Sequence, residues 1–381
     1  MLFLLRTLAL TDFHDIMTLK REERVEHMKL NTLETPVLIL DELKFEANLK
    51  KMMDLIKDSG MALRPHYKSH KSVDIARKQI AYGAKGITCA KLGEAEDLAD
   101  AGIHDILIAN QIVQPSKLAR VAHLANKCKL TVCVDCEENI LALEQAAAMA
   151  NSLIHVYVEF DVGMKRCGVT SLEAVAKLAK AVQAQTHLSF DGIQAYAGQL
   201  SHEFDGEKRK KESGETDENL VALKAYLQEQ GINVKEISGG STGTALLKGN
   251  PKIYTELQAG TYIFMDASYA KMELPFEHSL FVLSTVISTG PNLVVTDAGV
   301  KAVGVDQGLP RFLDFPQDAP INLSEEHGAI RLTNHGRKIN DKVWYIPGHS
   351  CTTANLHNQI YLFQGDEVTG KILVTSRGKG Q

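Results

Sequence analysis

Short apolar runs alternate with longer segments of helical character from about residue 60 to residue 265. Apolar runs of four to eight residues predict buried strands, and longer stretches predict helices. Eight strands are predicted, at residues 62–67, 86–89, 105–109, 129–134, 155–160, 192–197, 234–237 and 256–259. The helical segments between them lie at residues 72–82, 92–101, 114–125, 137–150, 171–184, 217–230 and 242–247.

This alternation predicts a parallel sheet, and eight strand–helix units predict closure into a (β/α)8 barrel over residues 36–270. A doubly wound open sheet is the competing interpretation, which the lack of a G-x-G-x-x-G motif after an early strand disfavours. Active sites of barrels lie on the loops at the carboxyl ends of the strands. Polar residues follow the predicted strand ends, namely Lys68, Asn110, Asp135, Asp161, Arg166 and Tyr196.

The pattern changes after about residue 270, where long helical periodicity disappears. Strands separated by turns are predicted at residues 281–288, 292–296, 342–346 and 359–364. We therefore expect a separate C-terminal β domain over residues 271–381, joined by a strand at 36–40 and part of residues 1–35. Residues 1–10 are mostly apolar but too few to span a bilayer, and no small-residue cleavage site follows them.

Composition is that of an ordinary globular protein, with 44% apolar and 23% charged residues. The net charge of -5 argues against a nucleic-acid partner or a membrane surface, because both favour clustered Lys and Arg. Six cysteines in 381 residues include one lone C-x-x-C and do not indicate a disulfide framework. A reducing, cytoplasmic location is expected.

The octapeptide RPHYKSHK, residues 64–71, overlaps the end of the first predicted strand and continues beyond it. Alternation along a strand would direct His66 and Lys68 to the same face, inward at the top of a barrel. A lysine partly buried among other cations gives up its proton more readily and becomes a nucleophile for an aldehyde. A basic surface loop is the competing interpretation.

A glycine-rich segment, SGGSTGT at residues 238–244, follows the seventh predicted strand. Consecutive glycines let backbone N–H groups converge on an anion, and barrels often bind phosphate at this position. Gly240 and Thr242 are the candidate phosphate ligands, although a plain turn would also use such a sequence. In the C-terminal domain, His349 and Cys351 are two residues apart, so an extended strand would direct both toward one metal ion. A buried cysteine beside a surface histidine is the alternative.

The octapeptide strongly resembles the R-P-H-x-K-[ST]-H-K motif of the D-serine dehydratase and D-threonine aldolase group, which belongs to the alanine-racemase-like (fold type III) pyridoxal-phosphate (PLP) enzymes. The resemblance extends over residues 35–355. It implies that Lys68 carries PLP as a Schiff base, with His66 beside the cofactor. Residues 258–262 resemble the partner of the glycine-rich loop, which adds Gly260 and Tyr262 to the candidate phosphate site.

Two further segments share this resemblance. Residues 159–169 resemble the family's V-[ED]-[IV]-D-x-G-x-x-R-x-G segment, which implies that Arg166 lies near the cofactor ring or the Schiff base. Residues 195–198 resemble A-Y-x-G, which implies that Tyr196 faces the cofactor. Relatives on the aldolase side often have histidine after that glycine, where this chain has Gln199. His202 is then the nearby candidate base.

The resemblance also makes His349 and Cys351 ligands of a divalent ion near the cofactor. A thiolate ligand favours zinc, whereas an aspartate in its place would favour manganese or magnesium, which remain the alternatives. Two protein ligands leave positions open for a substrate hydroxyl. A homodimer is the family expectation.

The expected substrate is a D-configured 3-hydroxy amino acid. Cys351 narrowly favours a dehydratase that releases ammonia and a keto acid, whereas residues 254–266 resemble the aldolase branch, which cleaves the Cα–Cβ bond. An amino acid racemase would need no metal for a β-hydroxyl, so the His349–Cys351 pair argues against it. A non-catalytic PLP-binding protein would be a bare barrel, and the long second domain argues against that class.

Overall fold

The computed structural model describes residues 28–248, 253–316 and 319–381. The expectations for residues 1–10 lie outside this part of the chain. The chain divides into two compact units, which we describe separately. The barrel unit comprises Met53–Lys68, Gly83–Gly260 and Lys379–Gln381, and the sheet unit comprises residues 28–52, Ser69–Tyr82 and Thr261–Gly378.

The barrel unit contains eight strands, and every neighbouring pair is parallel. The strands are β2 (Ala62–Leu63), β3 (Ile87–Cys89), β4 (Asp105–Ile108), β5 (Lys129–Val134), β6 (Ile154–Glu159), β7 (Leu188–Ala195), β8 (Glu236–Gly239) and β9 (Glu256–Leu257). Their spatial order is β2-β9-β8-β7-β6-β5-β4-β3.

The two ends of this sheet meet. Lys85 N donates to Leu63 O (2.8 Å), Thr88 N donates to Pro65 O (2.9 Å), and His66 forms a parallel bridge with Thr88. The predicted closed barrel is thereby confirmed, and the open-sheet alternative is wrong.

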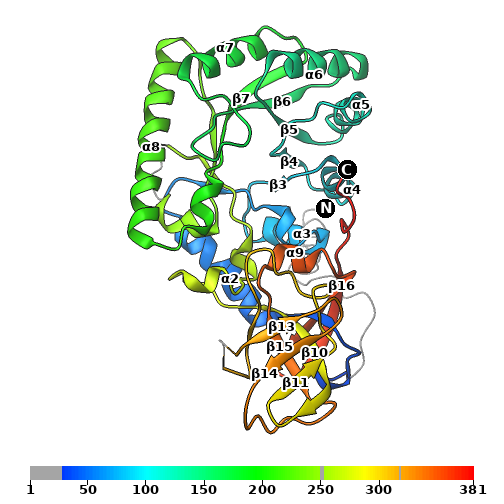
Figure 1. The fold of residues 1–381 in the computed structure, drawn as a ribbon. Coiled ribbons are helices and arrows are strands. Elements are labelled where there is room, and N and C mark those ends of the chain that lie inside the picture. Colours follow the sequence, from blue (N-terminus) through cyan, green and yellow to red (C-terminus); the bar gives the residue numbers. More distant parts are fainter. Residues whose placement is uncertain (1–27, 249–252, 317–318) are drawn as a thin grey trace, which may run out of the picture. The chain divides into compact units, whose positions relative to one another are not determined.

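Helices follow the strands on the outside of the barrel (Figure 1). They are α4 (Leu92–Asp100), α5 (Pro115–Leu124), α6 (Glu137–Ala150), α7 (Leu172–Gln183) and α8 (Gly206–Glu229). Helix α8 begins eleven residues before the predicted residue 217, because Asp205 caps it by accepting from the Glu207 and Lys208 amides. Its first turns bury Ser213 and Thr216 instead of apolar side chains, so no apolar stripe marks them in the sequence.

The sheet unit is built on a mostly antiparallel sheet, shown with its labelled strands in Figure 1. Its strands are β1 (Val37–Asp41), β10 (Leu280–Gly290), β11 (Leu293–Thr296), β12 (Arg311–Phe312), β13 (Ile321–Leu323), β14 (Gly328–Arg331), β15 (Lys342–Ile346), β16 (Gln359–Gln364) and β17 (Glu367–Leu373). Strand β1 pairs antiparallel with β10 and parallel with β16, so the strand expected at residues 36–40 does join this sheet.

Aromatic rings form part of the core of the sheet unit. Trp344 packs edge-on against Phe281 and Phe363, with ring centroids 5.5 and 5.4 Å apart. The helices of this unit are α3 (Val73–Ala81), α9 (Ser350–Ala354) and most of α2 (Glu42–Ile56). Among its short 3-10 helices are η1 (Leu30–Thr32), η5 (Thr261–Ile263) and η6 (Tyr269–Lys271).

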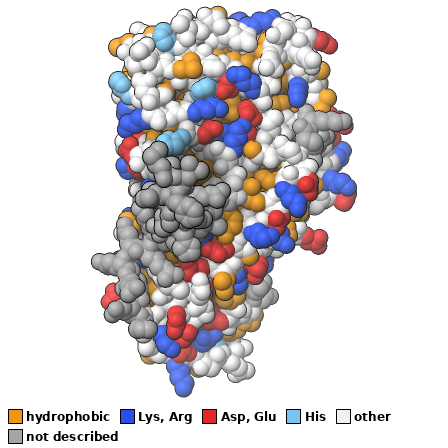
Figure 2. Space-filling model, turned by 180° about the vertical axis from the view of Figure 1, so that it is seen from behind, with side chains coloured by type: hydrophobic (Ala, Val, Ile, Leu, Met, Phe, Trp, Pro, Cys, Tyr) orange, Lys and Arg blue, Asp and Glu red, His pale blue; other side chains and the backbone are white. Residues whose placement is uncertain are grey.

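Surface charge is mixed. Basic and acidic side chains are interspersed over the described residues of the face that Figure 2 shows. Within residues 28–248, 253–316 and 319–381, no helix has the length and apolar character that crossing a membrane requires.

A buried ion-pair network connects the strands of the barrel. Arg64 is 1% exposed, and its guanidinium contacts the Asp105 carboxylate and the Glu256 carboxylate, each at 2.8 Å. Lys85 lies 2.8 Å from the same Glu256 oxygen, and the Tyr157 hydroxyl donates to the other at 3.3 Å. The arginine of the RPHYKSHK motif is therefore part of the barrel core and not of a basic surface loop.

We predict that Glu256→Gln destabilises the protein by about 3–5 kcal/mol, because it leaves Arg64 buried with less compensating charge. Burial alone would raise the pKa of Glu256, but Arg64 and Lys85 lower it from 4.5 to about 2. The carboxylate thus contributes stability that is complete above pH 4.5 and is lost as the pH falls through about 2. Urea denaturation at several pH values measures both effects.

The control is Asp100→Asn, which breaks an exposed ion pair with Lys127. Such pairs contribute roughly 0–1 kcal/mol, so the urea midpoint of this variant should change little. A Glu256→Gln protein as stable as the wild type would contradict a stabilising role for the network.

Candidate active site

A cavity of about 240 Å³ lies at the carboxyl ends of the barrel strands. Its lining residues are at strand ends or within the loops that follow β2, β3, β4, β6, β7 and β9, as expected for a barrel active site. They are His66, Lys68, Ala90, Ala109, Asn110, Gln111, Arg166, Cys167, Gln194, Tyr196 and Gln258. The sequence had singled out Lys68, His66, Asn110, Arg166 and Tyr196 among them.

Lys68 belongs to the 3-10 helix η2 (Tyr67–Ser69), which follows β2. Its Nζ lies 5.6 Å from the centroid of the Tyr196 ring, and the guanidinium carbon of Arg166 lies 5.9 Å from the same centroid. The Tyr196 hydroxyl is hydrogen-bonded to Ser201 Oγ at 3.1 Å. His66 is buried, and its Nδ1 accepts from the Lys68 amide at 3.4 Å. One amine and one guanidinium thus share an aromatic ring inside the cavity.

Carboxylates hold the loop that carries Arg166. The Gly168 amide donates to Asp135 Oδ2 at 3.0 Å, and Gln111 Nε2 donates to Glu159 Oε2 at 2.5 Å. Burial raises the pKa of Glu159, while Gln111 and Arg166 act in the opposite direction. The sequence analysis did not propose Gln111 or Glu159 as site residues. Their signal was present, because both are polar residues at or just beyond a strand end.

A second group that the sequence analysis missed consists of buried amides. Gln258 Nε2 donates to Gln194 Oε1 at 2.7 Å and lies 2.9 Å from Ser238 Oγ. These contacts connect β7, β8 and the end of β9 beneath the cavity. Gln194 lies within β7, whereas the candidate site residues were predicted only at positions just beyond the strand ends.

The glycine-rich loop begins where β8 ends and leads into the 3-10 helix η4 (Thr242–Leu247). Gly240 has a left-handed φ of +73°, and a Cβ there would lie 2.7 Å from Leu257 Cδ1. Thr242 is 1% exposed, and Gly260 follows Ala259, whose carbonyl accepts from the His66 amide at 3.1 Å. The adjacent glycines let backbone N–H groups approach an anion, and the Thr242 hydroxyl adds a donor, so these residues fit a phosphate group.

Other predicted residues lie elsewhere. His202 ends the 3-10 helix η3 (Gly198–His202), its ring lies edge-on to Phe204, and it is not among the residues lining the cavity. Tyr262 belongs to the sheet unit and is fully buried, where its hydroxyl accepts from Gln79 Nε2 at 3.2 Å. Burial raises the pKa of this phenol. Contacts of Tyr262 with phosphate and of His202 with substrate stay predictions.

The sheet unit contains His349 and Cys351. The expected extended strand is wrong: His349 has extended backbone angles and is the N-cap of α9, and Cys351 lies in the first turn of that helix. The pair is brought together by this turn into a helix, and the two side chains are hydrogen-bonded. The Cys351 sulfur also lies 3.8 Å from Ser69 Oγ and 3.9 Å from Thr261 Oγ1.

Charge surrounds the His349 ring. Burial lowers its pKa, but Cys351 and the Asp306 carboxylate outweigh burial and raise the pKa to about 10. An imidazole and a neighbouring thiol can bind a metal cation when they lose their protons. The described residues contain no group of three or more His, Cys, Asp or Glu side chains arranged to hold a metal ion. An imidazole and a thiol as a pair suit an ion whose other positions are filled by water or substrate.

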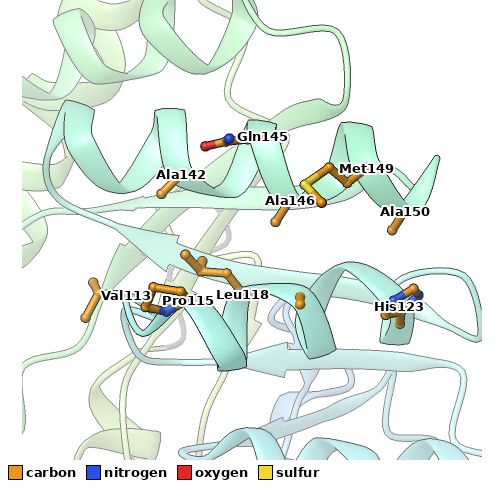
Figure 3. Close-up of a pocket in the computed structure, with 10 residues that line it drawn as sticks. Val113, Pro115, Leu118, His123, Ala142, Gln145, Ala146, Met149 and Ala150 are labelled. Atoms are coloured by element: carbon orange, nitrogen blue, oxygen red, sulfur yellow. The ribbon is translucent and has the colours of Figure 1, made fainter.

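A different pocket lies on the outside of the barrel, between α5 and α6 (Figure 3). It has a volume of about 460 Å³, and its apolar lining includes Val113 and Leu118 on one side and Met149 on the other. No lysine, arginine or acidic residue lines it. The cavity at the strand ends is the better candidate, because catalytic pockets combine apolar walls with convergent polar groups.

The cavity at the carboxyl ends of the closed parallel barrel contains a lysine, and the chain has a second, mostly antiparallel sheet. These two features are those of the alanine-racemase-like class of PLP enzymes, known as fold type III. The family description "Alanine racemase, N-terminal domain" matches residues 40–268, and a serine dehydratase domain matches residues 279–363. The chain belongs to the family that combines these two domains, that of the D-threonine aldolases and D-serine dehydratases.

Individual relatives agree. The chain is 38% identical to a 3-hydroxy-D-aspartate aldolase of Paracoccus denitrificans (strain Pd 1222), over 93% of this chain and 94% of the relative. It is 38% identical to a D-threonine aldolase of Arthrobacter sp., over 92% and 94%. The crystal structure of D-threonine aldolase from Filomicrobium marinum superimposes with a TM-score of 0.90 at 36% identity, over 92% and 97%. Aldolases and dehydratases are both lyases, and the chain is an enzyme of this class.

We predict that PLP attaches covalently to Lys68, because its amine is the one that lines the cavity. Borohydride reduction followed by peptide mass spectrometry should find the cofactor on the peptide containing Lys68, and Lys68→Ala should abolish this labelling. The control is Lys71→Asn, because Lys71 has a left-handed φ of +51° that asparagine tolerates. Labelling that survives in Lys68→Ala and is lost in Lys71→Asn would contradict this prediction and show that PLP attaches to Lys71.

Proposed function

We propose that the protein is a PLP- and metal-dependent aldolase that cleaves D-configured 3-hydroxy amino acids. The observation that carries the proposal is Lys68 in the cavity at the strand ends, beside Tyr196 and Arg166. The choice of reaction rests on the relatives. Proteins named aldolases are 36–38% identical to this chain, whereas a D-threo-3-hydroxyaspartate dehydratase of Delftia sp. is 31% identical and a D-serine dehydratase of Dictyostelium discoideum 26%. We therefore favour the aldolase reaction over the dehydratase reaction that Cys351 narrowly favoured in the sequence.

The residues of the cavity have separate tasks in this proposal. Lys68 would hold PLP, with the Tyr196 ring, Arg166 and His66 around the cofactor. Gly240, Thr242 and Gly260 would bind its phosphate through backbone N–H groups and a hydroxyl. When bound, PLP supplies an electron sink for a carbanion at the substrate Cα. The Arg166 guanidinium gives the cavity a positive charge, which suits an amino acid carboxylate.

His349 and Cys351 would hold the divalent ion, and a thiolate ligand favours zinc over manganese or magnesium. Solved structures of D-threo-3-hydroxyaspartate dehydratase include a variant with a histidine replaced by alanine, and one with a cysteine replaced by alanine in the metal-free form. The ion would supply Lewis acidity toward the 3-hydroxyl of the substrate. His202 is the proposed base for the hydroxyl proton, because it follows the Ala195–Gly198 segment at a position near the histidine of aldolases.

A dehydratase is the second candidate, and Cys351 is the observation that favours it. In that reaction Lys68 would remove the α-proton and the hydroxyl group would leave. A racemase and a non-catalytic PLP-binding protein remain disfavoured, because neither uses the His349–Cys351 pair. The homodimer stays a prediction of the family resemblance, and the cytoplasmic location stays a prediction from the cysteine content.

We predict that the purified protein, supplied with PLP and zinc, converts D-threonine to glycine and acetaldehyde. D-3-Hydroxyaspartate should give glycine and glyoxylate. Chromatography of the products, with L-threonine and D-alanine as control substrates, measures the reaction and its stereochemistry. Lys68→Ala should lose all turnover, because it removes the amine that would hold the cofactor.

Each other outcome has a definite meaning. Ammonia with 2-oxobutyrate from D-threonine would establish the dehydratase in place of the aldolase. Turnover of D-alanine to L-alanine would establish a racemase. A protein that binds PLP but leaves every 3-hydroxy D-amino acid intact would contradict the lyase proposal.

Metal removal gives a separate prediction. Dialysis against a chelator should abolish turnover, and zinc should restore it. Cys351→Asp should shift the preference toward manganese, because a carboxylate is a harder ligand than a thiolate. The control is Cys128→Ser, a half-buried thiol of the barrel unit, which should leave the metal content unchanged. Full activity in chelator-treated, metal-free protein would contradict metal dependence.

A further inference from the structure

We propose that Asp306 is a positioning residue that orients His349 for metal binding. This inference rests on the metal site of the proposed function. Asp306 Oδ2 lies 2.7 Å from His349 Nδ1. Because Nδ1 faces the carboxylate, Nε2 is the ring nitrogen that would bind an ion in this proposal.

The Asp306 carboxylate is itself fixed. Its other oxygen, Oδ1, accepts from Thr352 Oγ1 at 2.6 Å, and Thr352 lies in α9, the helix that His349 caps. Both carboxylate oxygens are therefore engaged by a single short segment, residues 349–352. A carboxylate held at two points keeps one orientation, so it can fix the plane of the imidazole ring as well as its position.

Backbone contacts fasten the loop of Asp306 to the same segment. The His349 amide donates to Gly304 O at 3.2 Å, and the Gly304 amide donates to Thr353 Oγ1 at 2.9 Å. A Cβ at Gly304 would collide with the Thr352 side chain, so glycine is what allows this close approach. These hydrogen bonds hold the loop of Asp306 against residues 349–353. The contact between Asp306 and His349 is therefore fixed by the backbone as well as by the two side chains.

The chemistry of histidine ligands explains what this contact does. A metal-binding histidine usually donates its second N–H to a carboxylate or a carbonyl, which fixes the tautomer and makes the ligand nitrogen more basic. Asp306 is not itself arranged as a third ligand, since no such three-residue group occurs in the described part of the chain. With only two protein ligands, an ion depends strongly on the correct orientation of each one. The alternative is a plain surface ion pair, with no effect on metal affinity.

The test is the zinc affinity of the full-length protein, measured by competition with a chromogenic chelator. Asp306→Asn should weaken zinc binding about 10- to 100-fold. Thr352→Val, which frees one carboxylate oxygen, should weaken binding by a smaller factor. The control is Asp314→Asn, which removes a 2.9 Å ion pair with Arg337 in the same unit and should leave zinc affinity unchanged. The absorption spectrum of the cobalt-substituted protein gives a second readout, because it reports ligand geometry directly.

Unchanged zinc affinity and an unchanged cobalt spectrum in both Asp306→Asn and Thr352→Val would overturn the proposal while leaving the metal site intact. If Asp306→Asn does not fold, Thr352→Val decides alone, since it leaves the carboxylate in place. Wild-type protein that binds neither zinc nor manganese would overturn the metal site of the proposed function, and this inference with it. Loss of affinity in the two variants and not in Asp314→Asn supports the role of Asp306.

Discussion

The buried guanidinium of Arg64 holds the barrel together where its strands are shortest. Strands β2 and β9 have only two residues each, so their backbone pairing alone gives the closing edge few hydrogen bonds. Arg64 follows β2 directly and bonds to carboxylates from β4 and β9. The 3-10 helix that carries Lys68 starts three residues further on, at Tyr67. The buried ion pairs thus anchor the backbone close to Lys68, since charged groups this deeply buried tolerate little displacement.

The cavity illustrates how a rigid barrel supports a polar site. Its side chains come from six different loops, yet hydrogen bonds connect them to strands at one end, as Gln111 does with Glu159 and Gln258 with Gln194. These amides and carboxylates satisfy one another in a low-dielectric setting, where an unpaired polar group would be costly. Lys68 and Arg166 line the same cavity, and they lie 5.6 and 5.9 Å from the centroid of the Tyr196 ring.

The sequence predicted the barrel because its strands and helices follow one another with clear apolar periodicity, and the active-site edge because polar residues cluster at strand ends. It placed the start of α8 too late, since buried hydroxyl groups there replace the apolar stripe. It treated His349 and Cys351 as neighbours on a strand, although a helix begins between them. It could not recognise Asp306 at all, because that contact joins loops more than forty residues apart. Partners at long range leave no local pattern.

The order of the sheet has a consequence for how the protein is made. Strand β1 is synthesised among the first described residues and is almost wholly buried, but the strands that pair with its two edges, β10 and β16, follow all the strands of the barrel unit in the chain. On the ribosome, nearly all of the barrel unit emerges while β1 still lacks both neighbours. An apolar strand whose edges stay unpaired during synthesis can pair with the wrong strand or with another chain. The sheet around β1 can therefore form only after β10 and β16 have been synthesised, long after β1 itself.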